Sequence, residues 1–231
     1  MSKIGIICAV DRELSPFLEK LHPKALPPQA MLTFYQGQIG KHQIILVRCG
    51  VCKVNAAIAA QALIDRFQVD LLINSGTAGG INPSVQLFDT IISEKIAYHD
   101  VAPHILTQYH SFMESVYFPA DPRLLALMRQ CAPQLPIPLR FGATVTGEQF
   151  IDTGMREEID RQFSPLSADM EGAAIAHVCH VNHIPFLMIR SITDTPTHSG
   201  MDHFEQNCEK ASGLACEATL ALIGKIPSQG I

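Results

Sequence analysis

Short apolar runs and amphipathic segments alternate from the start of the chain. Residues 3–9 form an apolar run of strand length. Residues 11–21 follow with helical spacing and should begin a helix at Asp11, a residue type common at helix N-termini, and end it before Pro23. A strand therefore leads almost directly into a helix.

The next segments continue this alternation. Residues 31–37 and 43–49 are strand-like and flank a Gly-Lys pair, which predicts a hairpin. Apolar residues within 53–67 recur at helical spacing, and 69–74 forms another strand. That strand runs into three glycines typical of a turn, namely Gly76, Gly79 and Gly80.

The second half of the chain repeats the same order. Its expected elements are strand 89–98, helix 121–132, strand 140–147, helix 154–163, helix 171–182, strand 185–192 and helix 202–224. Alternating strands and helices predict an α/β fold. We expect one domain, 1–231, that forms a three-layer α/β/α sandwich around a mixed, mostly parallel, twisted sheet.

Two stretches carry no clear period. Residues 22–30 contain three prolines and connect early elements. Residues 101–118 hold two histidines and several aromatic residues, which indicates a long functional loop.

Composition narrows the class of protein. With 231 residues, 47% of them hydrophobic, the chain is long enough for a well-filled core. No apolar run approaches the length of a membrane span, and the N-terminus leads straight into a strand rather than a signal peptide, so we expect a cytoplasmic protein. The net charge of −5, with no basic stripe, argues against nucleic acid as a partner. A small molecule is the expected ligand.

Cysteine and histidine patterns indicate no redox or metal centre. The seven cysteines have no framework spacing and are interpreted as free thiols, and the pair Cys49 and Cys52 does not open a helix after a strand. His177, His180 and His183 lie three apart and drift around a helix, which makes a shared metal ion geometrically awkward.

Several blocks resemble one protein family. They are residues 4–9, 74–80, 98–100, 146–151 and 173–178, followed by Asp194. In these blocks the chain resembles the 5′-methylthioadenosine/S-adenosylhomocysteine nucleosidases of the nucleoside phosphorylase superfamily, over nearly its whole length. The resemblance implies a homodimer that cleaves a small nucleoside without a metal or organic cofactor.

Two carboxylates suit this chemistry. Cleaving the bond between ribose and adenine needs an acid beside purine N7 and a base that activates water on the other face of the sugar. Asp194 follows an apolar strand, where partial burial can raise its pKa, so it is the expected acid. Glu13 lies in a polar turn after the first strand, where its charge is easily kept, so it is the expected base.

The resemblance also implies contacts to the ribose. Glu171 would accept hydrogen bonds from the ribose hydroxyls as a carboxylate, and Met170 would pack against the sugar. Arg190 would help to hold the ribose end of the site, and Thr77 would lie near the attacking water.

Four further residues are expected around the purine. Phe150 would stack on its face, and Ile151 would offer backbone hydrogen bonds to its edge. Ser191 would face the base together with Asp194, and Phe204 would close over it.

Two other functions remain open. A phosphorylase would bind phosphate near the glycine-rich turn with arginines such as Arg12 and Arg48. Glu13 after the first strand favours water instead, because a carboxylate base and a phosphate exclude each other by charge. A catalytically silent nucleoside-binding domain would be expected to lose one carboxylate, whereas this chain keeps both Glu13 and Asp194.

The chain departs from the family pattern in three places. Asp169 stands where many relatives have glutamate, and Glu148 where aspartate is common. After Asp100, residues 101–106 replace a familiar run that helps to form the pocket for the 5′ substituent, in part across the dimer interface. Methylthioadenosine, S-adenosylhomocysteine, 5′-deoxyadenosine and aminodeoxyfutalosine therefore all remain candidate substrates.

Overall fold

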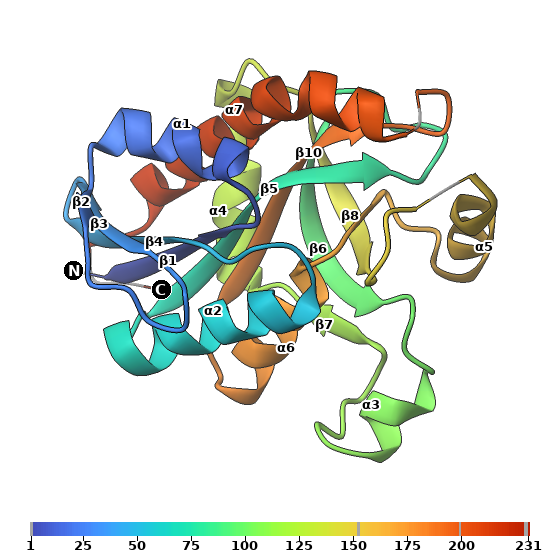
Figure 1. Cartoon of the computed structure of the whole chain (residues 1–231), viewed down its shortest axis with the longest axis horizontal. Coiled ribbons are helices and arrows are strands. Elements are labelled where there is room, and N and C mark those ends of the chain that lie inside the picture. Colours follow the sequence, from blue (N-terminus) through green and yellow to red (C-terminus); the bar gives the residue numbers. More distant parts are fainter. Residues whose placement is uncertain (1, 152, 199, 229–230) are drawn as a thin grey trace.

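The structure is a computed structural model that describes residues 2–151, 153–198, 200–228 and 231 (Figure 1). Its helices are α1 (Asp11–Leu21), α2 (Lys53–Phe67), α3 (His104–Gln108), α4 (Pro122–Cys131), α5 (Thr153–Phe163), α6 (Gly172–Val181) and α7 (Met201–Lys225), with a 3₁₀ turn at Ala132–Gln134. Its strands are β1 (Lys3–Cys8), β2 (Lys24–Ala25), β3 (Phe34–Ile39), β4 (His42–Arg48), β5 (Leu71–Gly80), β6 (Thr90–Tyr98), β7 (Tyr117–Pro119), β8 (Leu139–Thr146), β9 (Ser167–Asp169) and β10 (Phe186–Asp194).

All of these strands join one mixed sheet. β1 pairs in parallel with β4 and β5, β5 with β10, and β8 with β6 and β9. β10 also pairs antiparallel with β6, and β9 antiparallel with β5. The strands β5, β10, β6, β8 and β9 therefore close into a ring, which the expected open sandwich did not include.

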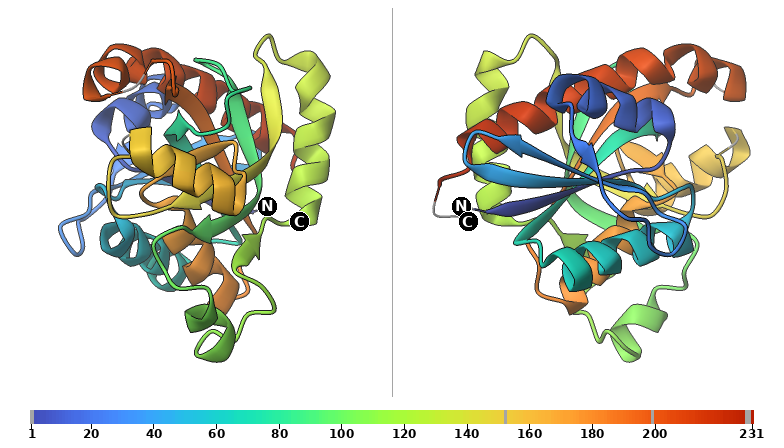
Figure 2. Two further views of the ribbon diagram at one scale, coloured as in Figure 1. Left: turned by 90° about the vertical axis from the view of Figure 1, so that its right-hand side faces the viewer. Right: turned by 60° about the vertical axis from the view of Figure 1, so that its left-hand side comes forward.

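Alternation along the strands places apolar side chains on both faces of the sheet. Helices lie on both sides of the sheet in Figure 2. In β1, Ile4 and Ile6 pack with residues of α1, α4 and α7, whereas Ile7 packs with residues of α2 and α6. Each fully buried isoleucine contributes about 1.5–3 kcal/mol relative to an exposed one. Helices therefore cover both faces, as the alternating pattern predicts.

Most element boundaries agree with the sequence pattern within two residues. The prediction was incomplete in the two aperiodic stretches, because 22–30 contains β2 and 101–118 contains α3 and the start of β7. Helix α1 begins at Asp11, but its N-cap position is Val10, and the Glu13 side chain accepts from the Val10 backbone. Among the described helices, none is both long and apolar enough to cross a membrane.

The prediction of a glycine-rich turn after residue 74 is wrong. Residues 71–80 form one continuous strand, β5, so Gly76, Gly79 and Gly80 are strand residues. A Cβ atom at Gly76 would lie 2.4 Å from Glu13 Cδ and 2.6 Å from Arg190 Nη1. This glycine is required because two side chains from other elements occupy the space beside it.

Candidate active site

A pocket opens where β1, β5 and β10 reach their carboxyl ends, the edge at which parallel sheets bind ligands. The segment after β8 and the first turn of α7 complete its wall. Eight of the ten residues predicted for the site line it: Glu13, Thr77, Phe150, Ile151, Met170, Glu171, Asp194 and Phe204. Arg190 and Ser191 do not.

Glu13 is buried in this pocket, with 3% of its surface exposed. Its Oε2 accepts from the Ala9 backbone at 2.6 Å, and its Oε1 accepts from the Thr77 backbone at 2.7 Å and from Thr77 Oγ1 at 2.8 Å. The prediction that Glu13 lies in a polar turn is therefore wrong. Backbone and hydroxyl donors, rather than solvent, satisfy this carboxylate. Its orientation is fixed by β1 and β5 together.

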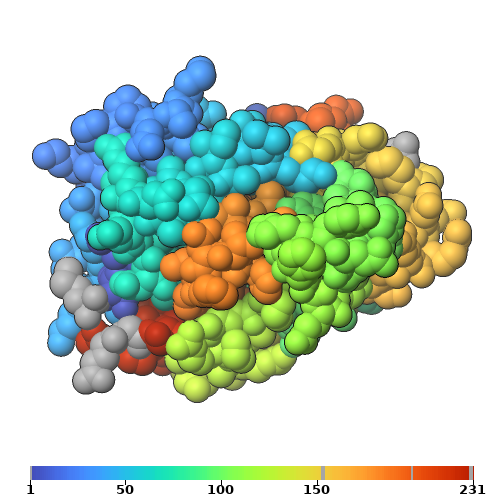
Figure 3. All heavy atoms as spheres, turned by 90° about the horizontal axis from the view of Figure 1, so that it is seen from below, coloured from blue at the N-terminus to red at the C-terminus, as the bar shows by residue number. Residues whose placement is uncertain are grey.

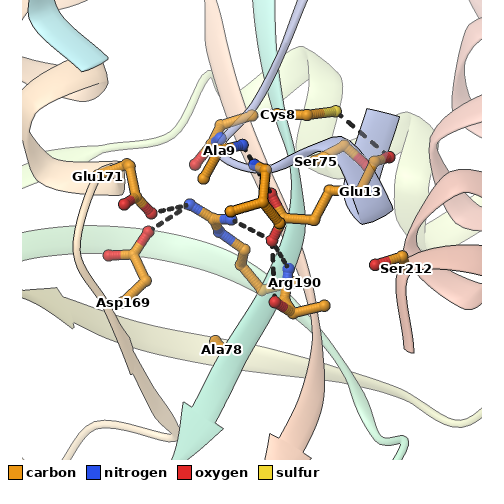
Figure 4. A network of polar contacts seen from close by, with 12 residues as sticks. Cys8, Ala9, Glu13, Ser75, Ala78, Asp169, Glu171, Arg190 and Ser212 are labelled. Carbon is orange, nitrogen blue, oxygen red and sulfur yellow. Dashed lines mark hydrogen bonds and ion pairs between the residues drawn. The ribbon is translucent and has the colours of Figure 1, made fainter. Parts of the chain in front are cut away.

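Arg190 lies behind the pocket and joins three carboxylates (Figure 4). It is fully buried, and its guanidinium donates to Asp169 at 2.6 Å, to Glu171 at 3.1 Å and to Glu13 at 3.4 Å. Removing one partner of such a buried group is costly, because the remaining charges lose their compensation. Arg190 thus holds Glu13 and Glu171 in place and does not itself reach the pocket.

Glu171 precedes α6 and is 4% exposed. Its carboxyl accepts from the Cys52 backbone at 3.0 Å and from Arg190. Burial, together with the nearby charges of Asp169 and Glu13, raises the pKa of Glu171 to about 8, although Arg190 acts to lower it. Burial therefore works against the charged form of this carboxyl group.

This raised pKa predicts a pH-dependent stability. Folding raises the pKa of Glu171 from its ordinary value of 4.5 to about 8, so its contribution to stability is present below about pH 4.5 and is lost as the pH rises through 8. Glu171→Gln cannot ionise and removes this loss. We expect the Tm advantage of the variant over the wild type to grow from pH 5 to pH 9, by about 2–4 °C for each kcal/mol recovered. A Tm difference that stays constant across this range, or that the exposed-site control Glu19→Gln reproduces, would contradict the assignment.

Asp194 ends β10 and is 2% exposed. Its Oδ1 accepts from Thr193 Oγ1 at 3.0 Å, and its Oδ2 accepts from Arg156 in a buried ion pair. A Cβ atom at Gly79 would lie 3.2 Å from Oδ2, so this glycine leaves room for the carboxylate. Thr193 and Arg156 both line the pocket, and sequence reasoning missed both.

The expectation that Ser191 faces the ligand disagrees with the structure. Ser191 is fully buried, does not line the pocket, and its Oγ lies 2.7 Å from Thr90 Oγ1. The pairing of β10 with β5 shifts between Ile192 and Asp194, and this irregularity brings both Thr193 and Asp194 to the pocket. Thr193, rather than Ser191, therefore lines the pocket.

Two aromatic residues stand at the pocket mouth. Phe150 is 39% exposed, and its ring lies 6.5 Å from that of Phe204 at an interplanar angle of 76°. Ile151 and Met170 line the same pocket. Side chains of the segment after β8 and of α7 therefore meet at this pocket.

Residues 101–118, which we call the divergent segment, lie away from this pocket. No residue of 101–118 is among those that line it, and Ile105 of α3 is exposed. Figure 1 places α3 on the far side of the molecule from α1 and α7.

The cysteines considered for a redox centre are free thiols, and His177, considered as a metal ligand, packs against other side chains. All seven cysteines are free, including Cys49 and Cys52. His177 stacks on Phe118 and lies within hydrogen-bond distance of Tyr98 and Ser111. These contacts are those of a packed side chain.

Comparison with known proteins places this site in a family. The model of the phosphorylase superfamily matches residues 3–224. The 5′-methylthioadenosine/S-adenosylhomocysteine nucleosidase of Tolumonas auensis is 34% identical over 97% of this chain and 100% of its own length. The chain belongs to this nucleosidase family within the phosphorylase superfamily.

Solved structures agree with this placement. The nucleosidase of S. pneumoniae, solved with a transition-state inhibitor, is 31% identical, with a TM-score of 0.87 over 96% of this chain and 99% of that one. A futalosine hydrolase of Helicobacter pylori, 24% identical, shares the fold with a TM-score of 0.89 over 97% of this chain and 98% of its own.

Proposed function

We propose that this chain, as a single domain of residues 1–231, hydrolyses the N-glycosidic bond of 5′-modified adenosines and releases adenine. The observation that carries the proposal is the meeting of Glu13, Glu171 and Asp194 in one pocket at the carboxyl ends of β1, β5 and β10. A purely binding domain would have no need for a buried carboxylate with the hydrogen bonds of Glu13 and a second with those of Asp194.

The reaction follows from the chemistry of these groups. Asp194 gives a proton to purine N7, the bond between N9 and C1′ breaks, and its electron pair stays with the purine. Glu13 takes a proton from water, and the water oxygen forms the new bond to C1′. Glu171 binds the ribose hydroxyls, and Phe150 stacks on the purine.

Water is the nucleophile in this proposal because of the charges around Glu13. Arg190, which forms an ion pair with Glu13, is already shared with Asp169 and Glu171. Arg12 and Arg48, which kept the phosphate alternative open, form surface ion pairs with Glu205 and Asp11 and do not line the pocket. A phosphate beside Glu13 would be repelled by that carboxylate and would meet little free positive charge.

The 5′ substituent faces a largely apolar surface in this proposal. Val10, Val51 and Met201 complete the pocket wall. Such a wall favours the alkylthio group of methylthioadenosine, with S-adenosylhomocysteine, 5′-deoxyadenosine and aminodeoxyfutalosine as the compounds to compare. Release of adenine from each of the four tests the proposal. Binding without adenine release from any of them would make the chain a nucleoside-binding protein instead.

We also propose that the chain is a homodimer that pairs through one apolar face. We define this apolar face by Val51, Val54 and Ile58 at the start of α2 and by Ile105, Tyr109 and Phe112 of the divergent segment, all of them exposed. Figure 3 shows α2, α6 and the divergent segment on one side of the molecule. An exposed apolar surface of this kind is typical of a protein interface. In the dimer, the divergent segment of one copy would reach the pocket of the other.

A charge at the centre of this face should separate the dimer. Val54 is 69% exposed, so Val54→Glu should leave the folded monomer intact. In the dimer the new carboxylate would be buried without a partner, which costs about 3–5 kcal/mol and weakens association by about two to four powers of ten. Light scattering after gel filtration should show monomers for this variant and dimers for the control Gln36→Glu. A dimeric Val54→Glu protein would place the interface elsewhere.

A further inference from the structure

Arg156 is a charged residue inside the pocket that the proposed reaction does not yet use. It comes from α5, whose neighbouring residues Glu157 and Glu158 are exposed, yet Arg156 itself is 4% exposed. A guanidinium is expensive to bury unless it is paired. Its burial beside Asp194 therefore needs an explanation.

Two contacts fix the guanidinium. Nη1 donates to the backbone carbonyl of Gly80 at 2.5 Å, and Nη2 donates to Asp194 Oδ2. Nε has no hydrogen-bond partner among the described residues. The end of β5 thus serves as the anchor, and the Asp194 carboxylate is the only charged partner recorded for Arg156 in the described chain.

The Asp194 carboxylate is also held from the side opposite Arg156. Thr193 donates to Oδ1 at 3.0 Å, while Gly79 leaves space beside both oxygens. With Arg156 on Oδ2, the plane of the carboxyl group is set by residues from β5, α5 and β10. A group that must meet one nitrogen of a bound purine benefits from this fixed orientation.

We propose that Arg156 is a positioning residue that acts through Asp194. The proposal rests on the proposed function. As the proton moves from Asp194 to N7 and the electron pair of the glycosidic bond passes to the purine, negative charge develops on the Asp194 carboxylate. The Arg156 guanidinium, held on the Gly80 carbonyl, stabilises that charge and keeps the carboxyl group in line.

A double-mutant cycle tests this role on methylthioadenosine. Arg156→Gln should lower kcat by about 10- to 100-fold, the scale of one charge-assisted hydrogen bond, with KM changed by less than about 3-fold. In an Asp194→Asn background the same substitution should have little further effect, within about 3-fold, because Arg156 has no charge left to stabilise. Arg161→Gln, an exposed arginine on the same helix, should leave kcat unchanged.

The outcomes separate this role from a structural one. If Arg156 only maintains the pocket, its substitution multiplies the loss in the Asp194→Asn background or raises KM alone, and either result overturns the proposal. Arg156→Lys covers the case of a poorly folded glutamine variant: it keeps the charge but cannot hold Gly80 and Asp194 together, so we expect a loss of about 3- to 10-fold that also vanishes in the Asp194→Asn background. A wild type that releases no adenine would refute the proposed function itself, before any Arg156 variant is measured.

Discussion

Asp194→Asn is expected to bind methylthioadenosine about as well as the wild type and to turn it over two to four powers of ten more slowly. Asparagine keeps the shape of the side chain and can still accept from Arg156, but it has no carboxyl proton to give to N7. Because the proton moves only in the transition state, the loss should fall on kcat rather than on KM. Steady-state adenine release and equilibrium binding of the substrate measure the two effects separately.

The control for this variant is Asp65→Asn, at an exposed position of α2. It should retain full activity. If Asp194→Asn turned over at a rate comparable to the wild type, Asp194 would not be the acid, and the role proposed for Arg156 would fall with it.

Glu13→Gln is expected to lower kcat by a similar two to four powers of ten, and also to destabilise the fold. Glu13 is surrounded by donors, namely the backbones of Ala9 and Val10 on Oε2 and the Thr77 backbone and hydroxyl on Oε1. An amide at this position must turn its NH₂ group toward donors, which leaves buried groups without an acceptor and costs about 1–3 kcal/mol. Adenine release and urea unfolding should report the two losses.

Glu19→Gln, at an exposed position of the same helix, should change neither quantity. A Glu13→Gln enzyme that is destabilised but retains wild-type kcat would mean that Glu13 is a structural carboxylate and that another group activates water.

Local patterns in the sequence predicted most of the fold. Apolar runs and helical spacing depend on neighbouring residues, so strands such as β1 and helices such as α2 could be recognised from them. The closure of β5, β10, β6, β8 and β9 into a ring depends on pairings between distant segments. No local period records such pairings.

The glycines of β5 show a second limit. Gly76 lies in a strand because Glu13 and Arg190 occupy the space where its Cβ would be. Strands disfavour glycine in their interiors, so the sequence alone made a turn the better interpretation.

The site shows a similar division. Residues placed by strand ends and by the family resemblance, such as Glu13, Glu171 and Asp194, reach one pocket. Thr193 rather than Ser191 lines the pocket because the pairing of β10 with β5 is irregular. Arg156 contacts Asp194 from a helix, 38 positions earlier in the chain. Neither contact leaves a signal in residue spacing.

In the proposed reaction, water that is activated by Glu13 attacks the sugar while Asp194 protonates the purine. The most direct test of this reaction is the sugar product that the wild-type protein forms from methylthioadenosine with and without saturating phosphate. We expect equal amounts of adenine and free 5-methylthioribose, at a rate that phosphate does not increase. Formation of 5-methylthioribose 1-phosphate, with a rate that rises with phosphate concentration, would contradict it.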